Sequence, residues 1–309
     1  MQSNGEIFAQ DSDFWDNYLI GRPKAPESLF DRIFSYHQSK GGAFGTAHDV
    51  GAGNGPYAQK LRSRFARVIV SDIVAENVEL ARRRLAGSPG GGFSFRVAKL
   101  QDADDIEPGS VDMVFATNVM HFPDPQGAAM ATVARQLRPG GTFAAAQFGP
   151  VRFHEPDLQD LWARISHEGG RQLLKGVDDP SETIRVMGRT QGTANIAPLS
   201  PEFFLPGAQR IHLNMDKGGI QGVLPPEETS RDTQPDYTGP GDVVLYENEE
   251  GWTFEADLAG VKAHFGSFPF VSQFPGAFED LYKDLEALMA HERIAKGYFP
   301  AKIILATRC

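Results

Sequence analysis

Residues 48–56 read His-Asp-Val-Gly-Ala-Gly-Asn-Gly-Pro, and this stretch decides how the rest of the chain is interpreted. Glycines alternate at 51, 53 and 55, and a helical pattern follows over residues 57–66. Because glycine has no Cβ, such a stretch forms a turn in which a ligand can lie directly against the backbone. Pro56 suits the first helical position, because an N–H group at that position forms no hydrogen bond within the helix and proline lacks one. The stretch therefore predicts a strand, a binding turn and a helix.

The spacing of the glycines separates two classes of ligand. The dinucleotide pattern Gly-x-Gly-x-x-Gly, counted from Gly51, would need its last glycine where Pro56 stands, which disfavours a nicotinamide dehydrogenase. The pattern acidic-x-Gly-x-Gly-x-Gly is met in full by Asp49, Gly51, Gly53 and Gly55. Here the chain resembles the class I methyltransferases that use S-adenosylmethionine. The resemblance implies that the turn holds the methionine end of the cofactor and that Asp49 holds its ammonium group.

This resemblance also implies a fold and a domain organisation. We expect an α/β protein with a Rossmann-like, seven-stranded sheet, helices on both faces, and a helical lid or insertion in the C-terminal half. The apolar run Ala301–Thr307 is the candidate for the antiparallel strand beside the fifth strand. Helices are predicted at 156–165, with Trp162 at core spacing, at 252–265 and at 275–295, and a long loop at 216–242. The expected units are an N-terminal flap and helix (1–40), the cofactor-binding core (41–150), and substrate-shaping lid segments with the final strands (151–309).

Further cofactor contacts are expected where the next strands end. Asp72 ends a β-branched strand and follows Gly51 by the roughly 20 residues at which a carboxylate accepts hydrogen bonds from ribose hydroxyls. Ile73 offers an apolar edge to adenine. Residues 101–106 resemble the family's Gly-Asp-Ala-Glu-Asp-Leu segment, whose acid lies at the adenine amino group, and Asn118 should lie near the methionine or sulfonium. The predicted cofactor-binding residues are Asp49, Gly51, Ala52, Gly53, Asp72, Ile73, Asp102, Ala103 and Asn118.

His121 is the candidate catalytic residue, because it follows the fourth strand at the edge where ligands of open α/β sheets bind. Whether it acts as a base or as a positioning group is left open. The segments Tyr18–Pro23, Met120–Phe122 and 252–267 look like the small-molecule methyltransferases typified by trans-aconitate methyltransferase. Members of that group esterify carboxylic acids, and many fungal relatives act on natural products. The predicted substrate-binding residues are Trp15, Tyr18, Arg22, Phe122 and Arg152, with Lys262 and His264 as further candidate partners of a carboxylate.

The predicted reaction is in-line transfer of a methyl group to the carboxylate of a small aromatic or dicarboxylic acid, which leaves S-adenosylhomocysteine. A carboxylic acid is ionised at neutral pH and needs no base, whereas a phenol benefits from one. Three alternatives remain. The chain is an O- or N-methyltransferase of a phenolic or amine metabolite, an S-adenosylmethionine-binding enzyme that does not methylate, or a regulatory protein that kept the fold.

The composition of the chain limits the classes of partner that we expect. Forty acidic and 30 basic residues give a formal charge of −10, which argues against nucleic acid. The single cysteine, Cys309, allows neither an internal disulfide nor a cysteine-based metal site, and no metal is expected. Residues 1–21 lack a signal pattern, and no apolar run approaches the length of a membrane span. We expect a soluble, cytoplasmic protein with a small-molecule substrate. The sequence does not set the oligomeric state and allows a homodimer.

Overall fold

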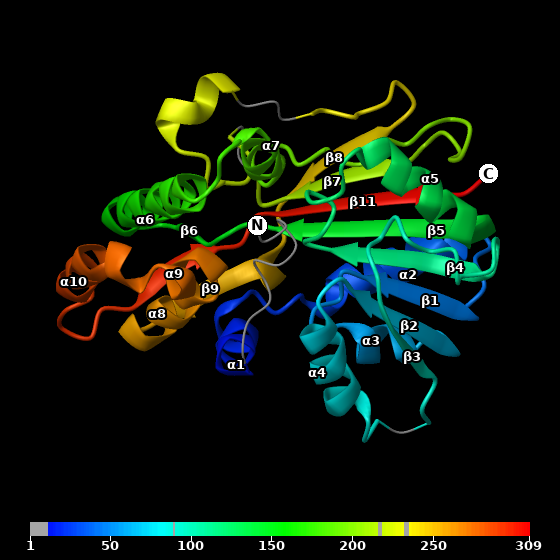
Figure 1. Cartoon of the computed structure of the whole chain (residues 1–309), viewed down its shortest axis with the longest axis horizontal. Coiled ribbons are helices and arrows are strands. Elements are labelled where there is room, and N and C mark those ends of the chain that lie inside the picture. Colours follow the sequence, from blue (N-terminus) through cyan, green and yellow to red (C-terminus); the bar gives the residue numbers. More distant parts are fainter. Residues whose placement is uncertain (1–11, 89, 216–217, 232–234) are drawn as a thin grey trace.

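The computed structural model describes residues 12–88, 90–215, 218–231 and 235–309, and its main layer is a mixed sheet of eight strands (Figure 1). The strand order is β3-β2-β1-β4-β5-β11-β7-β8. The strands are β1 (Thr46–Val50), β2 (Arg67–Asp72), β3 (Phe93–Val97), β4 (Val111–Thr117), β5 (Leu137–Phe148), β7 (Gln209–Leu213), β8 (Val243–Glu247) and β11 (Ala301–Thr307). From β3 to β5 all neighbours are parallel, whereas β11 is antiparallel to both β5 and β7. The predicted antiparallel strand at 301–307, beside the fifth strand, is confirmed.

The prediction of seven strands is wrong, because β8 extends the sheet beyond β7. Residues 243–247, Val-Val-Leu-Tyr-Glu, pair in parallel with β7, from Gln209 opposite Val243 to Leu213 opposite Glu247. Valine and tyrosine favour a pleated, half-buried surface. The edge of β7 would otherwise present unpaired N–H and C=O groups. The eighth strand therefore covers the edge of an otherwise seven-stranded sheet.

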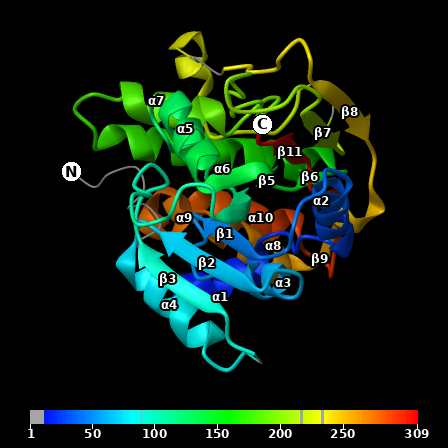
Figure 2. The same ribbon diagram turned by 90° about the vertical axis from the view of Figure 1, so that its right-hand side faces the viewer.

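Helices cover both faces of the sheet, as predicted. Side chains alternate along β5, so Ala146 packs in one core with Phe30 and Ile33, while Ala145 packs in the other with Met130. Figure 2 shows α2 and α5 on opposite sides of the sheet. The helices before residue 150 are α1 (Ser12–Gly21), α2 (Glu27–Ser39), α3 (Ala58–Arg62), α4 (Ala75–Leu85) and α5 (Gln126–Gln136).

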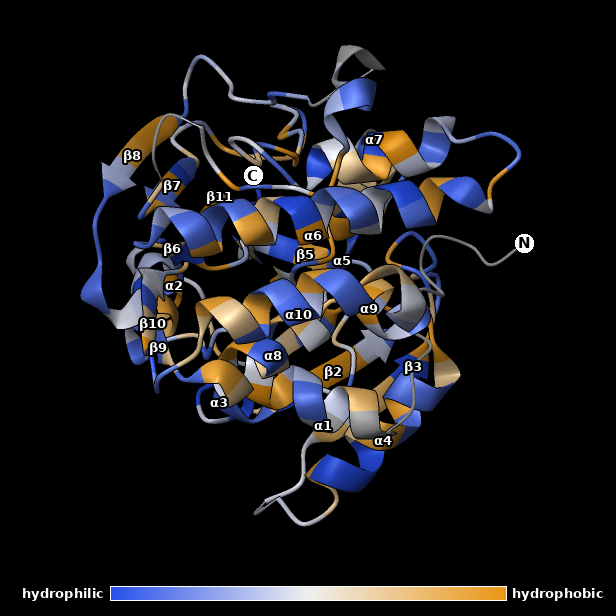
Figure 3. Cartoon of the chain, turned by 90° about the vertical axis from the view of Figure 1, so that its left-hand side faces the viewer, coloured by the Kyte–Doolittle hydropathy of each residue, from blue (hydrophilic) through white to orange (hydrophobic). Residues whose placement is uncertain are grey.

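Apart from β7, β8 and β11, the helices and strands after residue 150 form a second layer beyond the carboxyl ends of the parallel strands, at the left of Figure 1. Its three-stranded sheet consists of β6 (Arg152–Phe153), β10 (Ala295–Tyr298) and β9 (Thr253–Ala256). Its α-helices are α6 (Pro156–Lys175), α7 (Ser181–Arg189), α8 (Leu258–Gly266), α9 (Pro269–Gln273) and α10 (Glu279–Leu288). The 3-10 turns are η2 (Pro226–Arg231), η3 (Glu250–Trp252) and η4 (Pro275–Ala277). Figure 3 shows α6 and α10 side by side, with hydrophilic residues on the side toward the viewer.

Two predicted helices are shorter than expected. The helix predicted at 252–265 begins only at Leu258, because the Asp257 side chain caps it by accepting a hydrogen bond from Gly260 N (2.9 Å). Residues 253–256 instead pair with β10. The helix predicted at 275–295 is confined to α10. Within the described residues, no helix is both long and apolar enough to cross a membrane.

Candidate functional site

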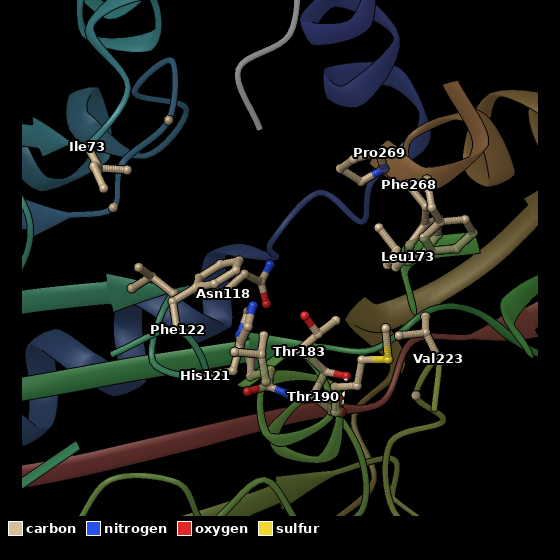
Figure 4. Close-up of a pocket in the computed structure, with 18 of the residues that line it drawn as sticks. Ile73, Asn118, His121, Phe122, Leu173, Thr183, Thr190, Val223, Phe268 and Pro269 are labelled. Atoms are coloured by element: carbon tan, nitrogen blue, oxygen red, sulfur yellow. Dashed lines mark hydrogen bonds between the residues drawn. The ribbon is translucent and has the colours of Figure 1, made fainter. Parts of the chain in front are cut away.

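A cavity of about 1380 Å3 lies between the carboxyl ends of the parallel strands and the second layer. Its wall combines the glycine turn after β1, the exits of β2, β4 and β5, and residues of α1, α6, α7 and α9. Pockets for one small molecule measure roughly 300 to 1,000 Å3, so this cavity has room for two. Figure 4 shows Ile73 on one side of it and Leu173, Phe268 and Pro269 across from it.

Most of the predicted site residues lie in this wall, although they come from distant parts of the sequence. The predicted residues that line it are Trp15, Tyr18, Arg22, Asp49, Gly51, Ala52, Gly53, Asp72, Ile73, Asn118, His121 and Phe122. Three predicted residues do not line it, namely Asp102, Ala103 and Arg152. Arg152 instead donates to the carbonyl of Gly219 (2.8 Å). Of the further carboxylate candidates, Lys262 pairs with Glu286 (2.6 Å).

The glycine turn needs its glycines for backbone conformation and for space. Gly51 has φ +61° and Gly53 has φ +55°, a region that side chains disfavour. A Cβ added to Gly51 would lie 2.3 Å from Val119 Cγ2, and one added to Gly53 would lie 3.0 Å from Trp15 Cη2. The turn is therefore packed between the exit of β4 and helix α1.

Two buried carboxyl groups flank the turn. Asp72 accepts hydrogen bonds from Gly53 N (2.8 Å) and Val74 N (2.9 Å), which fix the shape of the turn. Asp49 is only 1% exposed, and its Oδ2 has no hydrogen-bond partner among the described residues. Burial, with a smaller contribution from the charge of Asp72, raises the pKa of Asp49 to about 8. A buried carboxyl with an unused oxygen is the arrangement that a ligand ammonium group would complete.

The segment after β3 places its two predicted residues outside the cavity wall. Asp102 is exposed and Ala103 is fully buried, so neither reaches the cavity. Arginines hold the backbone instead, since Arg96 donates to the carbonyl of Asp102 (2.6 Å) and Arg135 donates to that of Ala103. Residues 98–101 line the cavity in their place, and Gln101, which stands where the related families have glycine, is among them.

One wall of the cavity carries a cation that has no acidic partner among the described residues. The Arg22 guanidinium lies 3.9 Å from the centroid of the Phe268 ring and 5.1 Å from that of Tyr18. Its Nη2 donates to the carbonyl of Ser267 (3.3 Å), and its Nε has no partner in the described part of the chain. No acidic side chain among the described residues forms an ion pair with it. Burial lowers the pKa of Arg22, but a guanidinium stays charged at any ordinary pH.

His121 stands at the exit of β4, with its ring 4.1 Å from that of Phe122 (Figure 4). Burial, together with the positive charges of Arg189 and Arg22, lowers its pKa to about 3. Its Nδ1 has no hydrogen-bond partner within the described residues. Arg189 braces this loop by donating to the carbonyl of Pro123 (3.1 Å) and to Asp124 Oδ1 (2.9 Å). The imidazole is therefore neutral and free to bond a ligand.

His264, a predicted carboxylate partner, has a structural place instead. It is fully buried, and its Nδ1 donates to the carbonyl of Gly21 (2.8 Å). Its Nε2 accepts from Val151 N (3.2 Å), and burial lowers its pKa to about 3. Both ring nitrogens are thus used, and the residue fixes the end of α1 immediately before Arg22.

The sequence prediction missed a large part of the wall. Residues of β5, α6, α7 and the α8–α9 turn line the cavity, among them Gln147, Trp162, Ser166, Thr183, Phe268 and Phe270. Trp162 was predicted only as a core residue of its helix. No local signal distinguishes a core position from a cavity position on an amphipathic helix. Among the described residues, no group of three or more His, Cys, Asp or Glu side chains is placed to hold a metal ion.

A mixed sheet with one antiparallel strand inserted beside the fifth strand, and a glycine turn with a buried acid after the first, define the class I methyltransferase fold. Residues 48–145 match a family model described as a methyltransferase domain. A solved structure from Anaeromyxobacter dehalogenans, named as a type II methyltransferase, has a TM-score of 0.56 over 93% of this chain and 97% of its own, at 18% identity. That likeness concerns the fold alone.

Two relatives are similar over the whole chain. Methyltransferase nsrG of Aspergillus novofumigatus is 56% identical over 309 residues, which cover all of both chains. Methyltransferase tpcM of Aspergillus fumigatus is 54% identical over 308 residues, which cover all of this chain and 95% of its own. The chain belongs to this methyltransferase family, and its cofactor is S-adenosylmethionine.

Proposed function

We propose that this methyltransferase methylates the carboxylate of a small aromatic acid. The observation that carries the proposal is the Arg22 guanidinium, a cation in the cavity wall with no acidic partner among the described residues. A charge in such a place is stabilised by an opposite charge, and an arginine fork matches the geometry of a carboxylate. The ring of Phe268 behind it and that of Phe122 across the cavity offer surfaces for an aromatic acid.

The protonation state of His121 supports a carboxylate over a phenol. An acceptor phenol has a pKa of about 10 and gains from a base whose pKa is near neutral. The pKa of His121 is about 3, so this imidazole holds a proton poorly at neutral pH. A carboxylic acid is already ionised there. His121 then serves as a neutral hydrogen-bonding group that positions the acceptor, and a cationic amine would be repelled by Arg22.

The same proposal assigns the cofactor contacts. Asp49 holds the ammonium group, and the turn at 51–53 carries the methionine end. The Asp72 carboxylate can accept further hydrogen bonds besides the two from the backbone, and it holds the ribose. Ile73 lies along the adenine. When bound, S-adenosylmethionine supplies a methyl group on a positively charged sulfur. The chain contributes orientation and the exclusion of water, which is worth on the order of 7 to 11 kcal/mol where the reactants are well aligned. Residues 151–309 act in this scheme as segments that shape and cover the acceptor site.

The test is product analysis with methyl-labelled cofactor and a panel of aromatic acids with their matched phenols and amines. We expect labelled methyl esters, which mild alkali hydrolyses, and no ethers or N-methyl products. Exchange of Arg22→Met should raise KM for the acid at least tenfold, because one charge-assisted contact is worth about 1.5 to 3 kcal/mol. The matched control Arg164→Met removes a surface arginine that pairs with Asp284 (2.8 Å) and should change KM less than about twofold. Label found only in alkali-stable ethers or amines would refute the proposal.

A further inference from the structure

The wall that α6 contributes to the cavity contains two polar side chains on one face of the helix. Trp162 and Ser166 are four residues apart, so they stand one above the other. Their exposed fractions are 0% and 1%, and both line the cavity. The mechanism proposed above uses neither of them.

Neither polar atom has a hydrogen-bond partner in the part of the chain that the structure describes. Trp162 Nε1 and Ser166 Oγ form no hydrogen bond with any described residue, although the indole ring packs firmly, 4.7 Å between centroids from both Phe265 and Phe268. A buried polar group without a hydrogen bond destabilises the folded protein. Native proteins satisfy nearly all such groups, and a ligand oxygen in the cavity would satisfy both of these neighbouring groups.

The surroundings of this pair are apolar. Leu173 of the same helix, with Val223, Phe268 and Pro269, forms the wall that faces Ile73 across the cavity (Figure 4). A few polar groups in an apolar wall set the orientation and the specificity of a ligand. The indole N–H only donates, so the matching ligand atom is an acceptor oxygen, and the serine hydroxyl can donate to or accept from the same substituent.

We propose that Trp162 and Ser166 form an oxygen-recognising subsite for the acceptor, whose ring therefore carries a hydroxyl or carbonyl oxygen besides the carboxylate. The Phe268 ring links the two sites, because the Arg22 guanidinium and the Trp162 indole both pack against it, at 3.9 and 4.7 Å from its centroid. The two oxygen-containing groups of the acceptor would therefore both be bound next to the Phe268 ring. This inference rests on the proposed function, since Arg22 is taken as the carboxylate site.

The test is calorimetric binding of benzoate and its three monohydroxy derivatives to the full chain saturated with S-adenosylhomocysteine. We expect one hydroxybenzoate to bind about tenfold more tightly than benzoate. The Ser166→Ala variant should lose most of that preference and keep its affinity for benzoate, and Trp162→Phe should do the same while keeping an aromatic ring. Alanine is a good helix former, so Ser166→Ala should fold normally. The control is Ser272→Ala, whose hydroxyl already donates to the carbonyl of Pro269 (2.9 Å) and which does not line the cavity.

Three results would overturn the subsite: no preference in the unmodified protein, a preference that both variants retain, or an equal loss of affinity for benzoate and hydroxybenzoates. The last would mean that the pair holds the carboxylate itself. Failure of the proposed function would be seen in the product analysis instead. The acids would yield no methyl ester there, whether or not the protein binds hydroxybenzoates more tightly than benzoate.

Discussion

Exchange of Asp49→Asn should stabilise the protein without cofactor and weaken cofactor binding. Burial raises the pKa of this carboxyl from its usual 3.8 to about 8. Between those pH values the unfolded chain releases a proton that the folded protein retains, so stability falls as the pH rises from about 4 to 8. At one pKa unit per 1.36 kcal/mol, the loss by pH 7 is at most about 4 kcal/mol.

The amide in Asp49→Asn carries no charge and avoids this loss, although its buried NH2 group costs about 1 to 3 kcal/mol when unpaired. The expected net gain at pH 7 is therefore about 1 to 3 kcal/mol in the free energy of unfolding. At pH 5 the variant should have lost this advantage, because the wild-type penalty is then only about 1.6 kcal/mol. In contrast, its affinity for S-adenosylhomocysteine should fall about 10- to 100-fold, as expected for one hydrogen bond to an ammonium group.

Urea unfolding of both proteins between pH 5 and pH 8, with calorimetric titration of S-adenosylhomocysteine at pH 7, measures both effects. The matched comparison is Asp72→Asn, which should destabilise the protein because its NH2 group would face one of the two backbone donors, Gly53 N and Val74 N, from which the carboxyl oxygens accept. If the stability difference for Asp49→Asn did not change with pH, or if its cofactor affinity equalled that of the wild type, the reasoning about this carboxyl would be refuted.

Three further predictions concern the rest of the site. Gly51→Ala places a Cβ 2.3 Å from Val119 Cγ2 at a φ of +61°, and calorimetry should show at least tenfold weaker binding of S-adenosylhomocysteine. His121→Asn should lower turnover less than about tenfold and leave the pH profile between 6 and 9 in place, because the pKa of His121 is about 3; recovery of activity at high pH would show instead that a base was lost. His264→Phe removes the hydrogen bond (2.8 Å) that fixes the residue before Arg22, so KM for the acid should rise several-fold while S-adenosylhomocysteine binding stays unchanged; an equal loss of both affinities would indicate general unfolding instead.

The cofactor half of the protein was largely predictable because its signals are local. The stretch 48–56 could be predicted from its own residues, because alternating glycines favour a turn with positive φ. The structure has positive φ at Gly51, Gly53 and Gly55. The run 301–307 is buried along its whole length, and its apolar stretch 303–306 is typical of a buried strand, although Lys302 interrupts the pattern. Strand β8 was missed for the opposite reason. As an edge strand it leaves Tyr246 64% exposed, and a half-exposed strand beside a polar loop has no clear alternation.

The adenine-side prediction depended on contacts that are distant in the sequence. In this segment Gln101 lines the cavity, whereas the predicted Asp102 and Ala103 do not. Arg96 and Arg135 draw the carbonyls of the next two residues outward, so the predicted Asp102 faces solvent and Gln101 lines the cavity. Such arginine contacts span 6 to 32 residues and leave no pattern in a single sequence.

The proposed acceptor site was the least predictable part, because its residues come from several elements that are far apart in the sequence. Arg22 is held by a carbonyl 245 residues later in the chain, and the histidine that fixes its neighbour Gly21 is 243 residues away. Trp162 has the helical spacing of a core residue, so its sequence position does not reveal a cavity. Only the folded structure shows that Trp162 packs against Phe268 and lines the cavity. The carboxylate site that we propose depends on the second layer folding correctly onto the first. Variation in α6 or the α8–α9 turn can therefore change the acceptor while leaving the glycine turn, and with it the cofactor, unaffected.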